Sequence, residues 1–304
     1  MCSIKKLKRQ LNVLNKIFWF GFYSKSWINY INRKKIDAVS TSLKDEVKPL
    51  LDKYKNVPIP DSQIGNRVWV FWYTGLDSAP SIVKKCIAEM RKMRDVDLVF
   101  LDKDNLDKYF IWDENIRKNF FDGVISVTLL TDVIRNQLMS LYGGFWFDST
   151  ILVIDNNFIL DHEHEQFYSV KHKDYAACTH FNSGKWSSFL SGMPKGHPLA
   201  SFTYDFFVWY FSKYDICFDY FMIDYIYLFA YMQLPQVKMQ IDALEAENED
   251  VFYLGRNIRK ICSNQQWKHI LDSNKIQKLV WKLDKTEKLG KSTVYSRILS
   301  FDGE

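Results

Sequence analysis

The segment from residue 140 to residue 154, SLYGGFWFDSTILVI, constrains this chain most strongly. Its two glycines lead into a nearly continuous apolar run, which is typical of a strand buried on both faces of a sheet. Asp148 interrupts this run, and a buried carboxylate is costly unless a cation, a metal ion or a polar ligand meets it. Open α/β sheets bind ligands at the carboxyl ends of their strands. Asp148 is therefore a candidate site residue. The alternative is a strand-terminal Asp that caps the next turn.

Residues 128–142, just upstream, predict an amphipathic helix. Thr128 can cap its start and Gly143 can end it. Asp132 and Arg135 lie three residues apart and so share a face of this helix. Taken alone, these two residues are better explained as a surface ion pair. The hydrophobic residues that recur at helical spacing are Leu130, Ile134, Leu138 and Leu141.

The motif DVIR, which begins at Asp132, and the motif LYGGFWFDST, which contains Asp148 and Thr150, together resemble the capsular polysaccharide synthesis glycosyltransferases. These enzymes are relatives of the glycosyltransferases with a DXD sugar-binding region. The resemblance implies that Asp132 and Arg135 hold the donor sugar and its phosphates, and that Asp148 contacts the nucleotide sugar or its metal ion. The implied cofactor is Mn²⁺ or Mg²⁺, with Asp148 as its ligand. Thr150 joins the donor-binding set, but it stands where the wider superfamily has a second Asp, which leaves metal coordination open.

Residues 67–75 resemble the first strand of the same family, in which an aromatic residue stacks on the nucleotide base. Trp72 best matches that position, and Trp69 and Tyr73 are the neighbouring alternatives. An aromatic ring can cover the π face of a nucleobase without reading its identity. In the competing interpretation, Trp69, Phe71 and Tyr73 alternate into the core while Trp72 faces a helix.

The resemblance covers residues 65–235, weakens beyond them and is absent before about residue 60. In the weaker part, residues 276–282 are similar to a C-terminal Lys-Leu motif. There, Lys278 or Lys282 could reach a diphosphate, and Lys278 is our candidate donor-binding residue. A plain amphipathic strand explains the same residues.

Residues 1–35 carry nine Lys or Arg and no acidic residue. A basic amphipathic helix with aromatic anchors favours the surface of an anionic membrane. The alternative is a solvated helix docked on the catalytic domain. No apolar stretch reaches the roughly 20 residues of a membrane-spanning helix, and a basic excess confined to one arm argues against nucleic-acid binding. The residues that form the apolar stripe and the aromatic anchors are Ile4, Leu7, Leu11, Leu14, Phe18, Trp19, Phe20, Phe22, Tyr23 and Trp27.

Later segments predict further elements. Residues 166–171 and 186–191 are expected to be short strands, and residues 197–233 to form two aromatic-rich helices. The run from Asp161 to Glu165 offers two His and three acids. Two His separated by one residue could point to one face, as some metal sites require. The run is wholly polar, however, and a solvated loop is the better interpretation.

The expected fold is α/β: a GT-A-like, Rossmann-related mixed sheet with flanking helices. We expect a basic helical extension over residues 1–60 and the glycosyltransferase domain over residues 61–304, with the boundary in the proline-containing segment 56–66. Five scattered cysteines without a CxxC spacing indicate reduced thiols, as in a cytoplasmic protein.

The function that the resemblance implies is hexose transfer from a nucleotide diphosphate sugar, with UDP-hexose as the expected donor. The acceptor would be a glycan, in a lipid-linked form, during capsular or exopolysaccharide assembly. The enzyme would act with retention at the cytoplasmic face of the cell membrane. One alternative is a catalytically silent partner that binds a nucleotide sugar or glycan in a membrane-associated complex, and another is a membrane-adsorbed scaffold.

Overall fold

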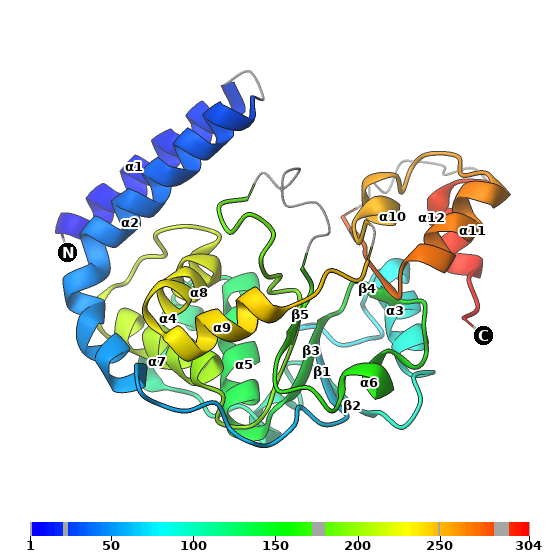
Figure 1. Ribbon diagram of the computed structural model, residues 1–304, viewed down its shortest axis with the longest axis horizontal. Coiled ribbons are helices and arrows are strands. Elements are labelled where there is room, and N and C mark those ends of the chain that lie inside the picture. Colours follow the sequence, from blue (N-terminus) through cyan, green and yellow to red (C-terminus); the bar gives the residue numbers. More distant parts are fainter. Residues whose placement is uncertain (1, 21–23, 172–179, 249, 283–291, 304) are drawn as a thin grey trace.

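The computed structural model describes residues 2–20, 24–171, 180–248, 250–282 and 292–303. Its centre is a five-stranded mixed sheet with the strand order β2-β1-β3-β6-β5 (Figure 1). The strands of this sheet are β1 (Arg67–Phe71), β2 (Asp97–Leu101), β3 (Gly144–Asp148), β5 (Tyr168–Ser169) and β6 (Leu190–Met193). Strand β1 runs parallel to β2 and β3, whereas β6 runs antiparallel to β3 and β5.

A second, two-stranded sheet follows the end of β3. It consists of β4 (Ile151–Val153) and β7 (Ile276–Lys278), which run antiparallel. The helices are α1 (Cys2–Phe20), α2 (Lys25–Tyr54), α3 (Ser81–Met90), α4 (Glu114–Phe121), α5 (Val127–Tyr142), α6 (Phe158–His162), α7 (Pro198–Lys213), α8 (Met222–Gln233), α9 (Pro235–Ala243), α10 (Tyr253–Arg256), α11 (Asn264–Ser273) and α12 (Val294–Ser300), with a 3₁₀ turn at Leu106–Lys108.

Helices cover both faces of the main sheet, because β1 buries alternate residues on opposite sides. Trp69 and Phe71 pack in one hydrophobic core with residues of α5, α7 and α8. Val68 and Val70 pack in a second core with α3, α11 and α12. The alternation is that of a strand buried on both faces. The expected α/β class, a mixed sheet with flanking helices, is confirmed, as are the two aromatic-rich helices, now α7 and α8.

The N-terminal residues form a helical hairpin that extends away from the sheet (Figure 1). Helix α2 packs against α7 and α8, and α1 packs along α2. The apolar residues Ile4, Leu7 and Leu11 of α1, which we expected to face lipid, are buried in the protein core. That part of the expectation was wrong, because α2 supplies the apolar surface that covers them. None of the described helices is both long and apolar enough to cross a membrane.

Three local predictions need correction. Strand β6 begins at residue 190, not 186: the backbone N–H of Ser187 bonds the Ser169 hydroxyl instead of a strand partner, and the Trp186 indole donates to Asp224. Helix α5 begins after Ser126, whose hydroxyl accepts from the backbone of Leu129, and so Thr128 is not the cap.

The third correction concerns His162 in the run 161–165: this residue is buried, whereas Asp161 and His164 are exposed as expected of a solvated segment. His162 ends α6 and is buried, with Nδ1 at 2.8 Å from Glu165 Oε1 and Nε2 at 3.2 Å from Glu247 Oε2. Burial alone would lower the pKa of His162, but these two carboxylates raise it to about 9. The second carboxylate comes from a distant segment, which the local sequence does not reveal.

Candidate active site

A cleft of about 1080 Å³ lies at the carboxyl ends of β1 and β3. The register of the parallel pair places Phe71 beside Asp148, so both strands end at the same edge. Helix α5 borders this cleft with Asp132 and Arg135, and β7 borders it with Lys278. The topology therefore brings together residues from the first strand, the central helix and strand, and the C-terminal region.

Two glycines bring the end of α5 and the start of β3 together at the opposite edge of the sheet, beside the start of β1. Gly143 has φ of 73° and ends α5, since its backbone N–H bonds the carbonyl of Met139. Gly144 has φ of 100°, and a Cβ there would lie 2.6 Å from the carbonyl oxygen of Arg67. Only glycine combines this conformation with such a close approach. The chain thus passes directly from the helix into a strand beside β1.

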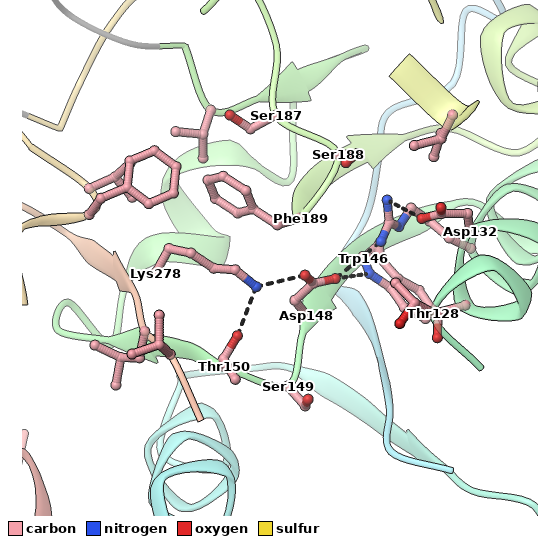
Figure 2. Close-up of a pocket in the computed structure, with 18 of the residues that line it drawn as sticks. Thr128, Asp132, Trp146, Asp148, Ser149, Thr150, Ser187, Ser188, Phe189 and Lys278 are labelled. Atoms are coloured by element: carbon pink, nitrogen blue, oxygen red, sulfur yellow. Dashed lines mark hydrogen bonds and ion pairs between the residues drawn. The ribbon is translucent and has the colours of Figure 1, made fainter. Parts of the chain in front are cut away.

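Asp148 is the centre of an ion-pair network. Its Oδ1 accepts from Arg135 Nη2 at 3.1 Å and from Trp146 Nε1 at 3.0 Å, and its Oδ2 accepts from Lys278 Nζ at 2.7 Å (Figure 2). Burial opposes ionisation of this carboxyl, but Lys278, Arg135 and the donated hydrogen bonds outweigh it and lower its pKa. Asp148 is therefore an anion held between two cations, not a turn cap.

Arg135 is the most buried cation of the cleft, with a side chain only 3% exposed. Its Nη1 lies 3.3 Å from Asp132 Oδ1, and its guanidinium lies over the ring of Trp146. Among the residues that the structure describes, its Nε and Nη1 have no hydrogen-bond partner. Unmet donors on a buried charged group are costly, and here they belong to a group that lines the cleft.

Asp132 is buried beside Arg135. Burial raises the pKa of Asp132 to about 7, with Arg135 opposing the rise and Asp148 and Asp224 adding to it. This carboxyl therefore changes charge near neutral pH, which is typical of residues at functional sites.

A model of the family described as "Capsular polysaccharide synthesis protein" matches residues 21–298. The chain belongs to this family. The match includes residues 21–60, so our expectation that the resemblance is absent there was wrong. Among solved structures, the chain is similar to one described as "PaToxG Glycosyltransferase", with a TM-score of 0.39 and 12% identity, covering 70% of this chain and 82% of that one. No curated protein is similar enough to count as a match.

The three aromatic candidates for base stacking differ in their positions: one is in the core and two line the cleft. Trp69 is fully buried and donates to the carbonyl of Gly143, so it belongs to the core. Trp72 lines the cleft, and its ring meets that of Trp281 edge-on at a centroid distance of 5.2 Å. Tyr73 also lines the cleft, but its ring packs against Phe71 and Phe120. The assignment of base stacking to Trp72 stays a prediction.

Asp224 of α8 is a cleft residue that our sequence reasoning did not select. It accepts from Trp186 Nε1 at 3.0 Å and lies 3.8 Å from His180 Nε2. Burial raises its pKa, and His180 and Trp186 oppose that rise. The signal was present in the sequence, because Asp224 interrupts the apolar run from Phe221 to Tyr225 just as Asp148 interrupts its strand.

Lys278 reaches the cleft from β7, and its ammonium donates to both Asp148 Oδ2 and Thr150 Oγ1, each at 2.7 Å (Figure 2). The resemblance suggested Lys278 or Lys282, and both line the cleft. Only Lys278 belongs to the network around Asp148. The short strand expected at this position is also present, as Ile276–Lys278.

The oxygens that the sequence suggested for a divalent ion are those that Lys278 already occupies. Mg²⁺ is usually held by one or two carboxylates together with substrate phosphates. Here Asp148 offers the one carboxylate and Thr150 a hydroxyl, and hydrogen bonds from Lys278, Arg135 and Trp146 already occupy their oxygens. Within the described residues, no group of three or more His, Cys, Asp or Glu could hold a metal ion. In this arrangement the residues do not fit Mn²⁺ or Mg²⁺, and the metal stays an untested prediction.

Proposed function

We propose that this chain is a nucleotide-sugar-dependent glycosyltransferase, which moves a hexose from a nucleotide diphosphate sugar to a glycan acceptor in capsular or exopolysaccharide biosynthesis. Membership of the capsular polysaccharide synthesis family supports the setting. The observation that carries the proposal is Arg135, a buried guanidinium in the cleft whose Nε and Nη1 have no hydrogen-bond partner among the described residues. A planar guanidinium recognises phosphate and sugar oxygens with several hydrogen bonds at once.

Transfer breaks the bond between C1 of the hexose and an oxygen of the diphosphate, and the electron pair stays on that oxygen. A new bond joins C1 to the acceptor oxygen, whose proton passes to the departing diphosphate. Arg135 and Lys278 stabilise the negative charge that develops on the leaving group, as preorganised donors do in other enzymes. Asp132 in its ionised form accepts hydrogen bonds from the sugar hydroxyls. Retention at C1 is our expectation for this reaction.

Asp148 has a positioning role in this proposal. Both of its carboxylate oxygens are occupied, one by Arg135 and Trp146 and the other by Lys278. It therefore holds two cations at fixed places before the donor arrives, which reduces the reorganisation needed during the reaction.

In this proposal, the nucleotide base lies at the end of the cleft that Trp72 and Trp281 line. Trp72 and Trp281 form a corner there, and Trp281 is 40% exposed. A base that stacks on one of these rings would gain from the π contact whatever its identity. We propose UDP-hexose as the donor, with the uracil covered by Trp72.

The N-terminal hairpin supports a proposed association with an anionic membrane, where a lipid-linked acceptor at the cytoplasmic face would be found. Attraction by exposed cations is the proposed cause, because the apolar stripe of α1 is buried. Cations close to an anionic bilayer contribute about 1 kcal/mol each to binding. Within residues 1–35, the exposed cations of the hairpin are Lys5, Lys6, Arg9, Lys16, Lys25, Arg33 and Lys34.

A thermal-shift screen with UDP- and GDP-sugars, followed by assays of donor hydrolysis and of transfer to glycan acceptors, tests this function. A ligand present at 100 times its Kd should stabilise the folded chain by about 2.7 kcal/mol. A nucleotide sugar that stabilises the chain and is turned over supports the proposal. Binding without turnover would instead support the catalytically silent partner, which the replacement of the second motif Asp by Thr150 favours. No binding of any nucleotide sugar would contradict both.

A further inference from the structure

We infer that Lys278 takes the place of a divalent cation in this site, so that donor binding and transfer need no metal ion. This inference rests on the proposed function, whose cleft and donor it shares. Lys278, from the C-terminal region, would supply the positive charge that a metal ion supplies in other sites.

The position of the ammonium is the first observation. Lys278 Nζ lies 2.7 Å from Asp148 Oδ2 and 2.7 Å from Thr150 Oγ1 (Figure 2). An ion that bound these two oxygens at about 2.1 Å, as Mg²⁺ does, would occupy the space of the ammonium and repel it. Lys278 and a metal ion are therefore alternatives at this point of the cleft.

A second observation is that the backbone holds Lys278 in place from both sides. Its own N–H bonds the carbonyl of Val251 at 2.7 Å, and the next N–H, of Leu279, bonds the carbonyl of Thr150 at 2.9 Å. Strand pairing adds the register between Lys278 and Ile151. These backbone hydrogen bonds thus fix Lys278 beside the end of β3, which carries Asp148.

Gly255 provides further support for this placement. A Cβ on Gly255 would lie 2.6 Å from the carbonyl oxygen of Lys278, and it would meet backbone, which cannot rotate away. The glycine lets α10 approach β7 closely, and this approach helps to set the depth at which Lys278 enters the cleft.

The hydrogen-bonding capacity of Lys278 is the third observation. An ammonium has three donors and no acceptor, and Asp148 and Thr150 take two of them. The remaining donor is available for an oxygen of the donor's diphosphate. Replacement of the second motif Asp by Thr150 agrees with this role, because a neutral hydroxyl is sufficient for a lysine that is already paired with Asp148.

The charges of the network point in the same direction. Asp148 is paired with two cations, Arg135 and Lys278, and Asp132 lies 3.3 Å from Arg135, so this group of four carries a net positive charge whenever Asp132 is protonated. A diphosphate brings negative charge to these two cations. A divalent ion at Asp148 Oδ2 and Thr150 Oγ1 would add positive charge beside two cations, where its binding would be opposed.

The experiment compares ligand binding and turnover with and without metal. Wild-type protein in excess EDTA should show the same thermal shift with UDP-hexose, and the same rate of donor hydrolysis, as in Mg²⁺ or Mn²⁺. Lys278→Met should fold, but in EDTA it should lose about a hundredfold in kcat/KM for the donor, as when one preorganised donor is removed. Lys268→Met, an exposed lysine on α11 outside the cleft, is the matched control and should behave as wild type.

A double variant sharpens the test. Thr150→Asp combined with Lys278→Met supplies a second carboxylate and removes the ammonium, and should make donor binding and turnover depend on Mn²⁺ or Mg²⁺. Direct titration with Mn²⁺ should detect binding to this variant in the presence of UDP, but not to wild type. If Lys278→Met does not fold, Lys278→Arg keeps the positive charge and should retain EDTA-resistant activity.

Two results would overturn the inference while leaving the proposed function intact. One is wild-type protein that binds or turns over the donor only when Mn²⁺ or Mg²⁺ is restored after EDTA. The other is folded Lys278→Met with wild-type kcat/KM in EDTA. If wild type binds no nucleotide sugar with or without metal, the proposed function itself fails, and the inference fails with it.

Discussion

The cleft and the N-terminal hairpin both contain basic residues, but they use them differently. In the hairpin, cations such as Lys5, Arg9 and Lys16 are exposed along two helices. In the cleft, Arg135 and Lys278 converge on one carboxylate, and the side chain of Arg135 is 3% exposed. Solvent screens exposed charges, whereas buried ones interact strongly and need partners.

This difference shows that the number of charges is a poor guide to a site. The hairpin contains the most basic part of the sequence, yet its exposed charges are screened by solvent. The cleft holds few charges, but its geometry leaves buried donors of Arg135 without a hydrogen-bond partner among the described residues. Single substitutions should therefore matter greatly in the cleft, and only several together in the hairpin.

The largest effect is expected at the most buried cation. Arg135→Lys keeps the charge but loses the planar fork that bonds Asp148 and faces Asp132. We expect kcat/KM for the donor to fall by about 10²–10³-fold, with the fold retained. Steady-state donor hydrolysis and circular dichroism measure the two properties. Wild-type kinetics in this variant would reduce Arg135 to a structural ion pair.

Asp148→Asn should come next, because it leaves two cations without their carboxylate. The kcat/KM for the donor should fall by about a hundredfold, and the free energy of unfolding at neutral pH should fall by about 1.5–3 kcal/mol, the usual contribution of hydrogen bonds to a charged group. In wild type the pKa of Asp148 is lowered, so this stabilisation is present above the unfolded pKa and is lost as the pH falls below about 4. Urea unfolding of both proteins across this pH range tests this expectation, because their free energies of unfolding should become equal at acidic pH.

The hairpin should respond only to a combined change. Replacing Lys5, Lys6, Arg9 and Lys16 by Gln should weaken binding to anionic vesicles by up to about 10³-fold, at about 1 kcal/mol for each cation near the surface. Soluble donor hydrolysis should not change. The control carries the same charge change at exposed cations outside the hairpin: Lys55, Lys108, Arg117 and Lys268. Equal loss of vesicle binding in both variants would show that net charge, not the hairpin, is responsible.

A smaller effect on activity is expected from Gly255→Ala. The new methyl group would press on the carbonyl of Lys278 and shift β7. We expect roughly a tenfold loss of kcat/KM, since misplacement of a positioned group by even a fraction of an ångström is costly. An unchanged rate would mean that the depth of Lys278 in the cleft is not critical. Gly303→Ala, at a half-buried glycine that does not line the cleft, is a suitable control, because its Cβ would meet only side chains.

The smallest effect concerns Asp132 and stability. Because burial raises its pKa to about 7, the folded chain binds this proton more tightly than the unfolded chain does. Ionisation therefore costs stability progressively as the pH rises from about 4 to about 7. Asp132→Asn should raise Tm relative to wild type at about pH 8 and much less at about pH 4. A Tm difference that does not depend on pH would show that ionisation of Asp132 does not destabilise the folded chain.

Much of the fold and part of the site were predictable from local patterns. Asp132, Arg135 and Asp148 lie in one short stretch of helix, glycine pair and strand, and local periodicity places them together. Asp224 carried the same signal as Asp148, an acidic residue in an apolar run, but lacked a neighbouring motif. The partners of Lys278 and of His162 come from distant segments, and no local pattern states which strand will lie beside which.

The burial of the α1 stripe was missed for a related reason. An amphipathic helix shows that one face will be covered, and here α2 covers it instead of lipid. Periodicity predicts the existence of an interface but not the identity of the other side.

The distance along the chain between Asp148 and Lys278, 130 residues, has a consequence for when the site comes into being. Arg135 and Asp148 can meet as soon as the central helix and strand have formed, early in synthesis. Lys278 joins them only after β7 has left the ribosome and paired with β4. Until then Asp148 has one cation instead of two. Under the proposed function, a nascent polypeptide that has not yet formed β7 is therefore expected not to turn over a nucleotide sugar.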